Sequence, residues 1–339
     1  MSPLRMVFCG TPQFAVPPLQ HLLQQTDFEV VSVFTQPDRP KGRGQEIVFS
    51  PVKEVALAAN LPVHQPARVR APEVEEQLRA LAPDVIVIIA YGQIIPAQLL
   101  TIPKFGWLNL HASLLPKYRG AAPINWAIVN GETRTGNTTM RIDTGMDTGE
   151  ILGQEELTIS PEETAPELAG RLAEAGAPLM AQTLRGLAAG ALRGRPQDDA
   201  AASLAPILKR EDGHIDWARS AGEIYNRMRG FAPWPGAYTE FRGQVCHLWG
   251  KPVSKEAEDG LEFIGGAFQR KSGGKPPHSK MAGAAPGTLL ATGGGLRVVC
   301  GQGSVLELTS VKLEGRKTIS AVEFARGARL QAGESLGKA

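Results

Sequence analysis

Short apolar runs alternate with longer amphipathic stretches through the first 188 residues of the chain. Residues 4–9, 28–35 and 84–90 are apolar runs of strand length, and the segments between them carry apolar residues at helical spacing. The run VIVII at residues 85–89 is apolar on both faces, as a central parallel strand covered by helices must be. This alternation predicts an α/β fold with a doubly wound, mostly parallel Rossmann-like sheet.

The same pattern places the remaining elements of this half. Ser50 and Pro51 are typical of the cap and the first residue of a helix. We expect helices at residues 14–25, 51–59, 73–81, 123–130 and 164–188, and strands at 61–64, around Asn109, at 136–142 and at 151–159. We expect a loop at 36–50, whose length is more typical of a functional segment than of a spacer.

Beyond residue 205 the pattern changes to short strands punctuated by glycines. We expect a helix at 221–229 and strands at 237–241, 245–249, 287–291, 296–299 and 305–311. Evenly spaced short strands predict a smaller OB-like β-barrel, a shape that often carries nucleic acid. The segment 252–286 interrupts these strands, and we expect it to be a flexible loop. Its basic part, residues 265–280, contains Arg270, Lys271, Lys275 and Lys280 and no acid.

A change of composition marks the boundary between the two halves. Residues 189–205 are rich in Ala, Gly, Arg and Asp, which is typical of an interdomain linker. We therefore predict a first domain at residues 1–188, a linker at 189–205, a second domain at 206–330 and a tail at 331–339.

Composition narrows the class of protein. With 42% hydrophobic and 21% charged residues among 339, the chain has an ordinary core-forming composition. No apolar run reaches the roughly 18 residues of a membrane span, and the N-terminus lacks a signal-peptide pattern, so we expect a cytoplasmic protein. Cys9, Cys246 and Cys300 are too widely spaced for a zinc site or a disulfide framework, and we expect buried thiols and no metal.

The charge is unevenly distributed along the chain. The net charge is +2, yet the part from Lys209 onward has 19 Lys and Arg against 13 Asp and Glu, which is +6 and leaves −4 for the first 208 residues. A mildly basic C-terminal half is compatible with a polyanionic partner, although it is weak evidence alone.

The loop at 36–50 concentrates cationic residues. Arg39, Lys41 and Arg43 stand among prolines and glycines, so the loop could become ordered against phosphate groups. A solvated surface loop explains the same composition equally well.

The turn between the first expected strand and the first expected helix has the position of the phosphate-binding turn in a dinucleotide site. The segment after residue 9, GTPQFA, lacks the Gly-x-Gly-x-x-Gly fingerprint, and Pro12 removes a backbone donor where a phosphate would be held. We therefore do not expect NAD binding.

A polar pair ends the strand around Asn109, in the stretch GWLNLHASLLPKYRG at residues 106–120. The Asn109 amide is able to donate to a developing oxyanion, and His111 is able to accept a proton near neutral pH. Asp143 and Asp147, in TTMRIDTGMDTGEI at 138–151, are candidates to orient the histidine. The spacing alone also fits a structural pair, in which Asn109 caps a turn and His111 is a satisfied core residue.

The longer string NLHASLLPKYRGAAPI, followed by DTGMDTG, resembles the 10-formyltetrahydrofolate-dependent formyltransferase family, and within it the members that act on methionyl-tRNA. The similarity extends from MVFCGTPQFA at residue 6 to GRKTIS at residue 315. The resemblance implies catalytic roles for Asn109, His111 and Asp147 and a folate-binding loop at Ser113, Leu114, Leu115 and Pro116. It also implies that residues 91–96 help to line the pterin pocket.

The resemblance further implies how the substrates are used. The formyl group would pass from N10 of 10-formyltetrahydrofolate to the α-amino group of methionine on initiator tRNA. Asn109 would stabilise the oxyanion, His111 would take the proton or donate to the oxyanion, and Asp147 would orient His111. Arg39, Lys41 and Arg43 would contact the tRNA acceptor stem, with Arg43 at the key position, and the C-terminal domain would also bind tRNA. We expect a monomer.

Three alternatives share part of this pattern. A formyltransferase acting on an amino sugar nucleotide, or a folate hydrolase, would use the same catalytic residues. A non-catalytic RNA-binding protein would account for the basic segments and the barrel, but it gives no reason for an Asn, His and Asp trio at strand ends.

Overall fold

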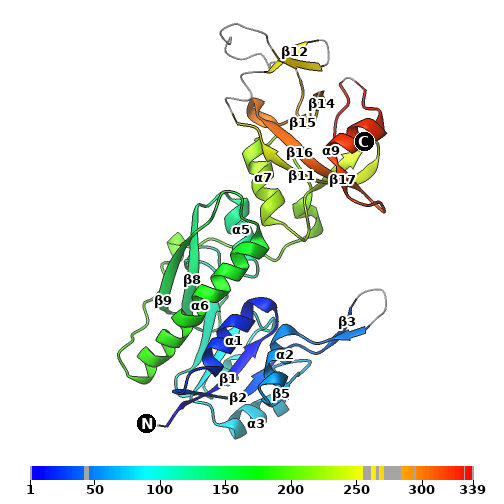
Figure 1. Ribbon diagram of the computed structural model, residues 1–339. Helices are drawn as coiled ribbons and strands as arrows, with labels where there is room; N and C mark the ends of the chain where they lie inside the picture. Colours follow the sequence, from blue (N-terminus) through cyan, green and yellow to red (C-terminus); the bar gives the residue numbers. More distant parts are fainter. Residues whose placement is uncertain are drawn as a thin grey trace. The chain divides into compact units, whose positions relative to one another are not determined.

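The computed structural model describes residues 2–41, 46–254, 261–264, 267–270, 284–292, 295–331 and 333–337. The chain divides into two units (Figure 1). The first comprises residues 1–124, 133–161 and 167–207, and the second comprises 125–132, 162–166 and 208–339. Each unit has its own hydrophobic core.

The first unit is built on a seven-stranded sheet with the order β5-β2-β1-β6-β7-β8-β9. The pairs from β5 to β7 are parallel, whereas β8 pairs antiparallel with β7 and with β9. The strands are β1 (Leu4–Gly10), β2 (Phe28–Phe34), β5 (Val63–His64), β6 (Val85–Ile89), β7 (Trp107–His111), β8 (Arg134–Arg141) and β9 (Ile151–Thr158). The prediction of a mostly parallel α/β sheet is confirmed.

Helices cover both faces of this sheet, which explains its continuous apolar strands. On β1, Met6 and Phe8 pack in one core cluster, whereas Val7 and Cys9 pack in the other. The first cluster receives residues of α1, α2 and α6, and the second receives residues of α3 and α4. These helices are α1 (Val16–Leu23), α2 (Pro51–Ala58), α3 (Pro72–Leu81), α4 (Ala97–Leu100) and α6 (Ala165–Ala188). Most of helix α5 (Pro123–Val129) belongs to the second unit.

The start of α2 confirms the predicted cap. The Ser50 hydroxyl accepts a hydrogen bond from the Lys53 backbone N–H at 3.1 Å, and Pro51 is the first helical residue. The 14–25 helix begins instead with a 3₁₀ turn at Gln13–Ala15 before α1. The short α4 was not predicted.

The predicted loop at 36–50 contains a short hairpin, so the expectation of a loop throughout is wrong. Strand β3 (Arg39–Lys41) pairs antiparallel with β4 (Glu46–Val48). Pro40 and the short length of each strand conceal this pairing, since neither segment alternates apolar and polar residues over a full strand.

The order of the strands places a switch point beside β1. The chain passes from β1 to β2 on one side and later returns to β6 on the other side. In open parallel sheets, ligands bind in the crevice outside the carboxyl ends of the strands at such a point. The carboxyl ends of β6 and β7 lie in this region, and β7 ends in His111.

The second unit carries an antiparallel sheet with the path β10-β11-β16-β15-β14, to which β17 adds at β16 (Figure 1). The strands are β10 (Tyr238–Phe241), β11 (Gln244–Pro252), β14 (Leu289–Thr292), β15 (Gly295–Val299), β16 (Val305–Leu313) and β17 (Ile319–Ser320). Helices α7 (Ala221–Gly230) and α9 (Ala321–Ala328) contribute apolar residues to the core of this unit. The described strands form an antiparallel half-barrel, in agreement with the predicted smaller OB-like β-barrel domain, although α9 was not predicted.

The insert at 252–286 is not loop throughout. Strand β12 (Leu261–Ile264) pairs antiparallel with β13 (Ala267–Arg270), which corrects the expectation of a flexible loop. Lys271, Lys275 and Lys280 lie outside the described residues.

Candidate active site

Strand β7 places Asn109 and His111 at the edge of the sheet where ligands are expected. Alternation along the strand directs Leu108 and Leu110 into the core with α1 and α6, so Asn109 and His111 face the other way. Asn109 is half-buried, and its side chain makes no hydrogen bond with another described residue. Its amide N–H groups are therefore available to a ligand.

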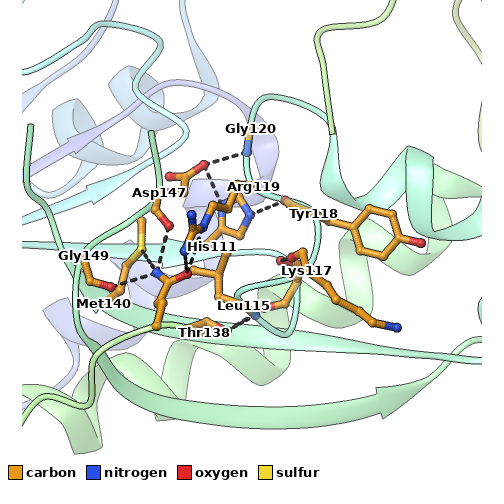
Figure 2. A network of polar contacts seen from close by, with 12 residues as sticks. His111, Leu115, Lys117, Tyr118, Arg119, Gly120, Thr138, Met140, Asp147 and Gly149 are labelled. Atoms are coloured by element: carbon orange, nitrogen blue, oxygen red, sulfur yellow. Dashed lines mark hydrogen bonds and ion pairs between the residues drawn. The ribbon is translucent and has the colours of Figure 1, made fainter. Parts of the chain in front are cut away.

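His111 is buried between a carbonyl group and a carboxylate (Figure 2). Its Nε2 lies 2.8 Å from the carbonyl oxygen of Tyr118, and its Nδ1 lies 3.6 Å from Oδ2 of Asp147. A carbonyl oxygen only accepts, so Nε2 carries a hydrogen and Nδ1 of the neutral ring is an acceptor. Asp147 Oδ2 accepts from the Gly120 N–H at 2.8 Å, which holds the carboxylate beside the ring.

The structure separates the two aspartates that the sequence left as alternatives. Asp143 is exposed, and its Oδ1 accepts from the Gly145 N–H at 2.9 Å and from the Thr148 hydroxyl at 2.7 Å. Asp143 thus closes the turn, whereas Asp147 is the aspartate beside His111.

A cavity of about 730 Å³ opens at this edge of the sheet. Asn109, His111 and Asp147 all line it, so the structure brings the predicted catalytic trio to one space. Residues 91–95, in the loop after β6, line it as well. A pterin pocket at residues 91–96 remains a prediction. Two apolar side chains in the lining are unusually accessible, with exposed fractions of 91% for Ile94 and 66% for Met146.

The predicted folate loop does not lie among the residues that line this cavity. Ser113 is fully buried, and its hydroxyl donates to the Lys117 carbonyl at 2.6 Å. The Leu115 N–H donates to the Thr138 hydroxyl oxygen at 3.1 Å. Ser113 and Leu115 therefore support the turn after β7 from within, and a folate contact for residues 113–116 remains a prediction.

The predicted tRNA-binding residues are only partly described. Arg39 is exposed on β3, whereas Arg43 and the side chain of Lys41 lie outside the described residues. The base of the hairpin is anchored by Asp38, which accepts from Lys53 and, at 2.8 Å, from the Gln65 amide. These hydrogen bonds lower the pKa of the Asp38 carboxyl below its ordinary value, so the carboxylate stays charged and the anchor persists at neutral pH.

Two residues at the site were missed by the sequence reasoning. Arg119 is buried, and its guanidinium contacts Gln197, which in turn hydrogen-bonds the backbone at Asp147 and Gly149. Gln197 belongs to the segment predicted as a linker, and no local pattern marks it. Only the three-dimensional contact reveals it.

The arrangement of potential metal ligands and of the cysteines limits the chemistry of this chain. Within the described part of the chain, no group of three or more His, Cys, Asp or Glu side chains is arranged to hold a metal ion. The three cysteines are free and buried, as expected, and burial raises the pKa of Cys246 to about 12, so that thiol is a poor nucleophile. No helix among the described residues is both long and apolar enough to cross a bilayer.

Family models match nearly the whole chain. The formyl transferase model matches residues 4–184, and the model of the formyl transferase C-terminal domain matches residues 207–329. A methionyl-tRNA formyltransferase of Solibacter usitatus is 51% identical over 99% of this chain and 99% of its own length. The same enzyme of Acidobacterium capsulatum is 50% identical over 98% and 100% of the two chains.

Solved structures share the fold at low sequence identity. WlaRD, a sugar 3N-formyl transferase, has a TM-score of 0.59 and 18% identity, covering 93% of this chain and 99% of its own. HypX from Aquifex aeolicus in complex with tetrahydrofolic acid has a TM-score of 0.58 and 16% identity, covering 96% and 47%. At these identities the likeness concerns the fold alone.

Proposed function

The chain belongs to the formyl transferase family, among the methionyl-tRNA formyltransferases, and we propose that Asn109, His111 and Asp147 carry out its reaction. It is a folate-dependent enzyme that formylates methionyl-tRNA for translation initiation. The observation that carries the assignment of the site is the arrangement around one cavity of a histidine–aspartate pair and an amide that has no partner among the described residues.

The cavity suits the folate co-substrate in size and chemistry. Its volume of about 730 Å³ lies in the range of small-molecule sites, and its wall combines apolar side chains such as Ile95 and Met140 with a few polar groups. The donor supplies an activated formyl group, whose carbon is attacked by the amine of the acceptor. We assign residues 91–95, which line the cavity, to holding the donor.

We assign Asn109 the role of donating a hydrogen bond to the formyl oxygen. Attack by an amine places negative charge on that oxygen, and a preorganised amide N–H stabilises the charge more in the transition state than in the ground state. Asn109 suits this role because its side chain has no competing partner among the described residues.

We assign His111 the role of accepting the proton that the amine loses. An α-amino group has a reference pKa of about 7.7 to 8.0, so part of it is neutral at pH 7 and the enzyme must accept only one proton during attack. The hydrogen on Nε2 is committed to the Tyr118 carbonyl, so the proton goes to Nδ1, 3.6 Å from the Asp147 carboxylate. Asp147 then stabilises the imidazolium, which returns this proton to N10 as the bond between the formyl carbon and N10 breaks and tetrahydrofolate leaves. This tautomer favours His111 as proton acceptor over a role as second oxyanion donor.

We propose initiator tRNA as the specific carrier of the methionine, and a monomer acting in the cytoplasm. The hairpin of β3 and β4 carries exposed Arg39, and the part of the chain from Lys209 onward has a net charge of +6 from 19 cationic and 13 acidic residues. Both features suit the phosphate backbone of a tRNA. The domain boundaries at residues 188 and 205 remain part of this proposal.

Replacing Arg43 by alanine is expected to raise the KM for methionyl-tRNA about tenfold, because one phosphate or base contact is lost. The KM for 10-formyltetrahydrofolate should stay unchanged. Steady-state kinetics with each substrate varied in turn measure both constants. Lys104→Ala is the charge control, because Lys104 precedes the amino end of β7, away from the cavity. Equal rises in both KM values for Arg43→Ala would show that the loop is structural.

A comparison of two acceptors tests the proposed function against a formyltransferase that acts on amino sugars. The protein, 10-formyltetrahydrofolate and either methionyl-tRNA or a nucleotide-linked amino sugar are incubated separately, and the formylated product is quantified. We expect product from methionyl-tRNA alone. Formylation of the amino sugar in preference to the tRNA would reject the proposal.

A further inference from the structure

Gln197 uses all of its side-chain hydrogen-bonding groups beside the candidate active site. Its Nε2 donates to the carbonyl oxygens of Asp147 and Gly149, each at 2.8 Å. Its Oε1 accepts from Nε and Nη2 of Arg119 at 3.0 and 2.8 Å. Carbonyl oxygens only accept and a guanidinium only donates, so the amide has one satisfactory orientation. The side chain therefore joins Arg119 to the backbone of the aspartate turn.

Arg119 gives this link a rigid support. The residue is buried, and its Nη2 also donates to the exposed Asp199 carboxylate at 2.8 Å. The planar guanidinium presents its N–H groups in a fixed geometry, so two hydrogen bonds that converge on Oε1 hold the Gln197 amide in place.

The turn that Gln197 contacts has an uncommon backbone conformation. Asp147 has a φ of 55°, in the left-handed region, which residues with a Cβ seldom adopt. Such a conformation persists when the surroundings determine it, and Gln197 holds carbonyl groups at Asp147 and two residues later at Gly149. The side chain of Asp147 leaves this turn toward Gly120 and His111 (Figure 2).

The same stretch of chain also supports the other neighbour of His111. The Tyr118 N–H donates to the Ser203 hydroxyl oxygen at 2.9 Å, and the Arg119 N–H donates to the Ser203 carbonyl at 2.8 Å. The Tyr118 carbonyl is the acceptor for His111 Nε2. Residues 197–203 thus hold both groups that flank the imidazole.

We propose that Gln197, backed by Arg119, is a positioning residue that sets the place of the Asp147 carboxylate relative to His111. The inference rests on the proposed function, because it requires Asp147 to act in catalysis. Without the two bonds from Nε2, the turn is free to move the carboxylate away from Nδ1.

The experiment measures formyl transfer to methionyl-tRNA by wild type, Gln197→Ala, Asp147→Asn and the double variant. We expect Gln197→Ala to lower kcat about 10- to 100-fold, because small misplacements of catalytic groups have effects of that size. The KM values for both substrates should change less than about twofold. In the Asp147→Asn background, Gln197→Ala should have no further effect, because the residue acts through Asp147.

Gln25→Ala is a matched control in the same unit. Gln25 likewise accepts from an arginine, Arg185, at 2.8 Å and donates to a carbonyl, that of His21, at 3.2 Å, but it lies at the end of α1. Its kcat should equal that of wild type. If Gln197→Ala folds poorly, the kcat of Gln197→Glu is measured instead. A carboxylate retains the bond to Arg119 but has no hydrogen for the two carbonyls, so the same loss of kcat is expected.

The outcomes separate this inference from the proposed function. An inactive wild type would reject the proposed function itself. An active wild type with an unchanged kcat for Gln197→Ala would overturn only the role of Gln197. A loss that multiplies with that of Asp147→Asn, or a rise in KM without a change in kcat, would also overturn it.

Discussion

Asn109→Ala is expected to lower kcat for formyl transfer about 100- to 1000-fold, the usual cost of removing one oxyanion donor. The reason is geometric, since Asn109 lines the cavity beside His111 and its amide has no partner among the described residues. For the same reason the free energy of unfolding should change little, because no hydrogen bond of the described structure is broken. Both substrates should still bind with KM values near those of wild type.

Asn109→Asp is a second variant that removes the donor while it keeps the size of the side chain. The carboxylate has nearly the shape of the amide but offers no hydrogen and adds negative charge where charge develops, so its kcat should be at least as low as that of Asn109→Ala. Chemical denaturation of each variant provides the folding control. A kcat near that of wild type in either folded variant would remove Asn109 from the mechanism.

Asp147→Asn is expected to lower kcat at least about 100-fold, because the imidazolium of His111 loses its carboxylate. The amide can also donate to the unprotonated Nδ1, which would occupy the nitrogen that accepts the substrate proton. Steady-state kinetics with methionyl-tRNA in excess measure the effect.

The chain supplies the matched control in Asp143. It belongs to the same turn, but within the described part of the chain its Oδ1 accepts only from Gly145 and Thr148, which an asparagine oxygen can also do. Asp143→Asn should therefore keep nearly the kcat of wild type. If Asp143→Asn lost activity and Asp147→Asn retained it, Asp143 rather than Asp147 would be the aspartate that acts in catalysis.

Elements with a clear local signal, either an apolar run of strand length or a helix cap, were predictable from the sequence. β1 and β6 are short apolar runs because the sheet is buried on both faces, and Ser50 and Pro51 mark α2 by local chemistry. The trio could be proposed because Asn109 and His111 end a recognisable strand and a family resemblance selected Asp147. Only the folded structure distinguishes Asp147, which lies beside His111, from Asp143, which closes the turn.

Features that depend on contacts distant in sequence were not predictable. β3 and β4 are too short for an alternating pattern, and the pairing of β12 with β13 interrupts a segment that looked like loop. Gln197 is 50 residues from Asp147, inside a stretch whose composition suggested a linker. A side chain that acts through tertiary hydrogen bonds leaves no periodic signal in the sequence.

The most direct measurement incubates the purified wild-type protein with 10-formyltetrahydrofolate and either methionyl initiator tRNA or the same tRNA uncharged. Folate absorbance and the acid-stable formylmethionyl product are followed together. We expect product, and matching consumption of the folate, only with the charged tRNA. Folate consumption at the same rate with uncharged tRNA, without formylmethionyl product, would contradict the assignment and indicate a hydrolase.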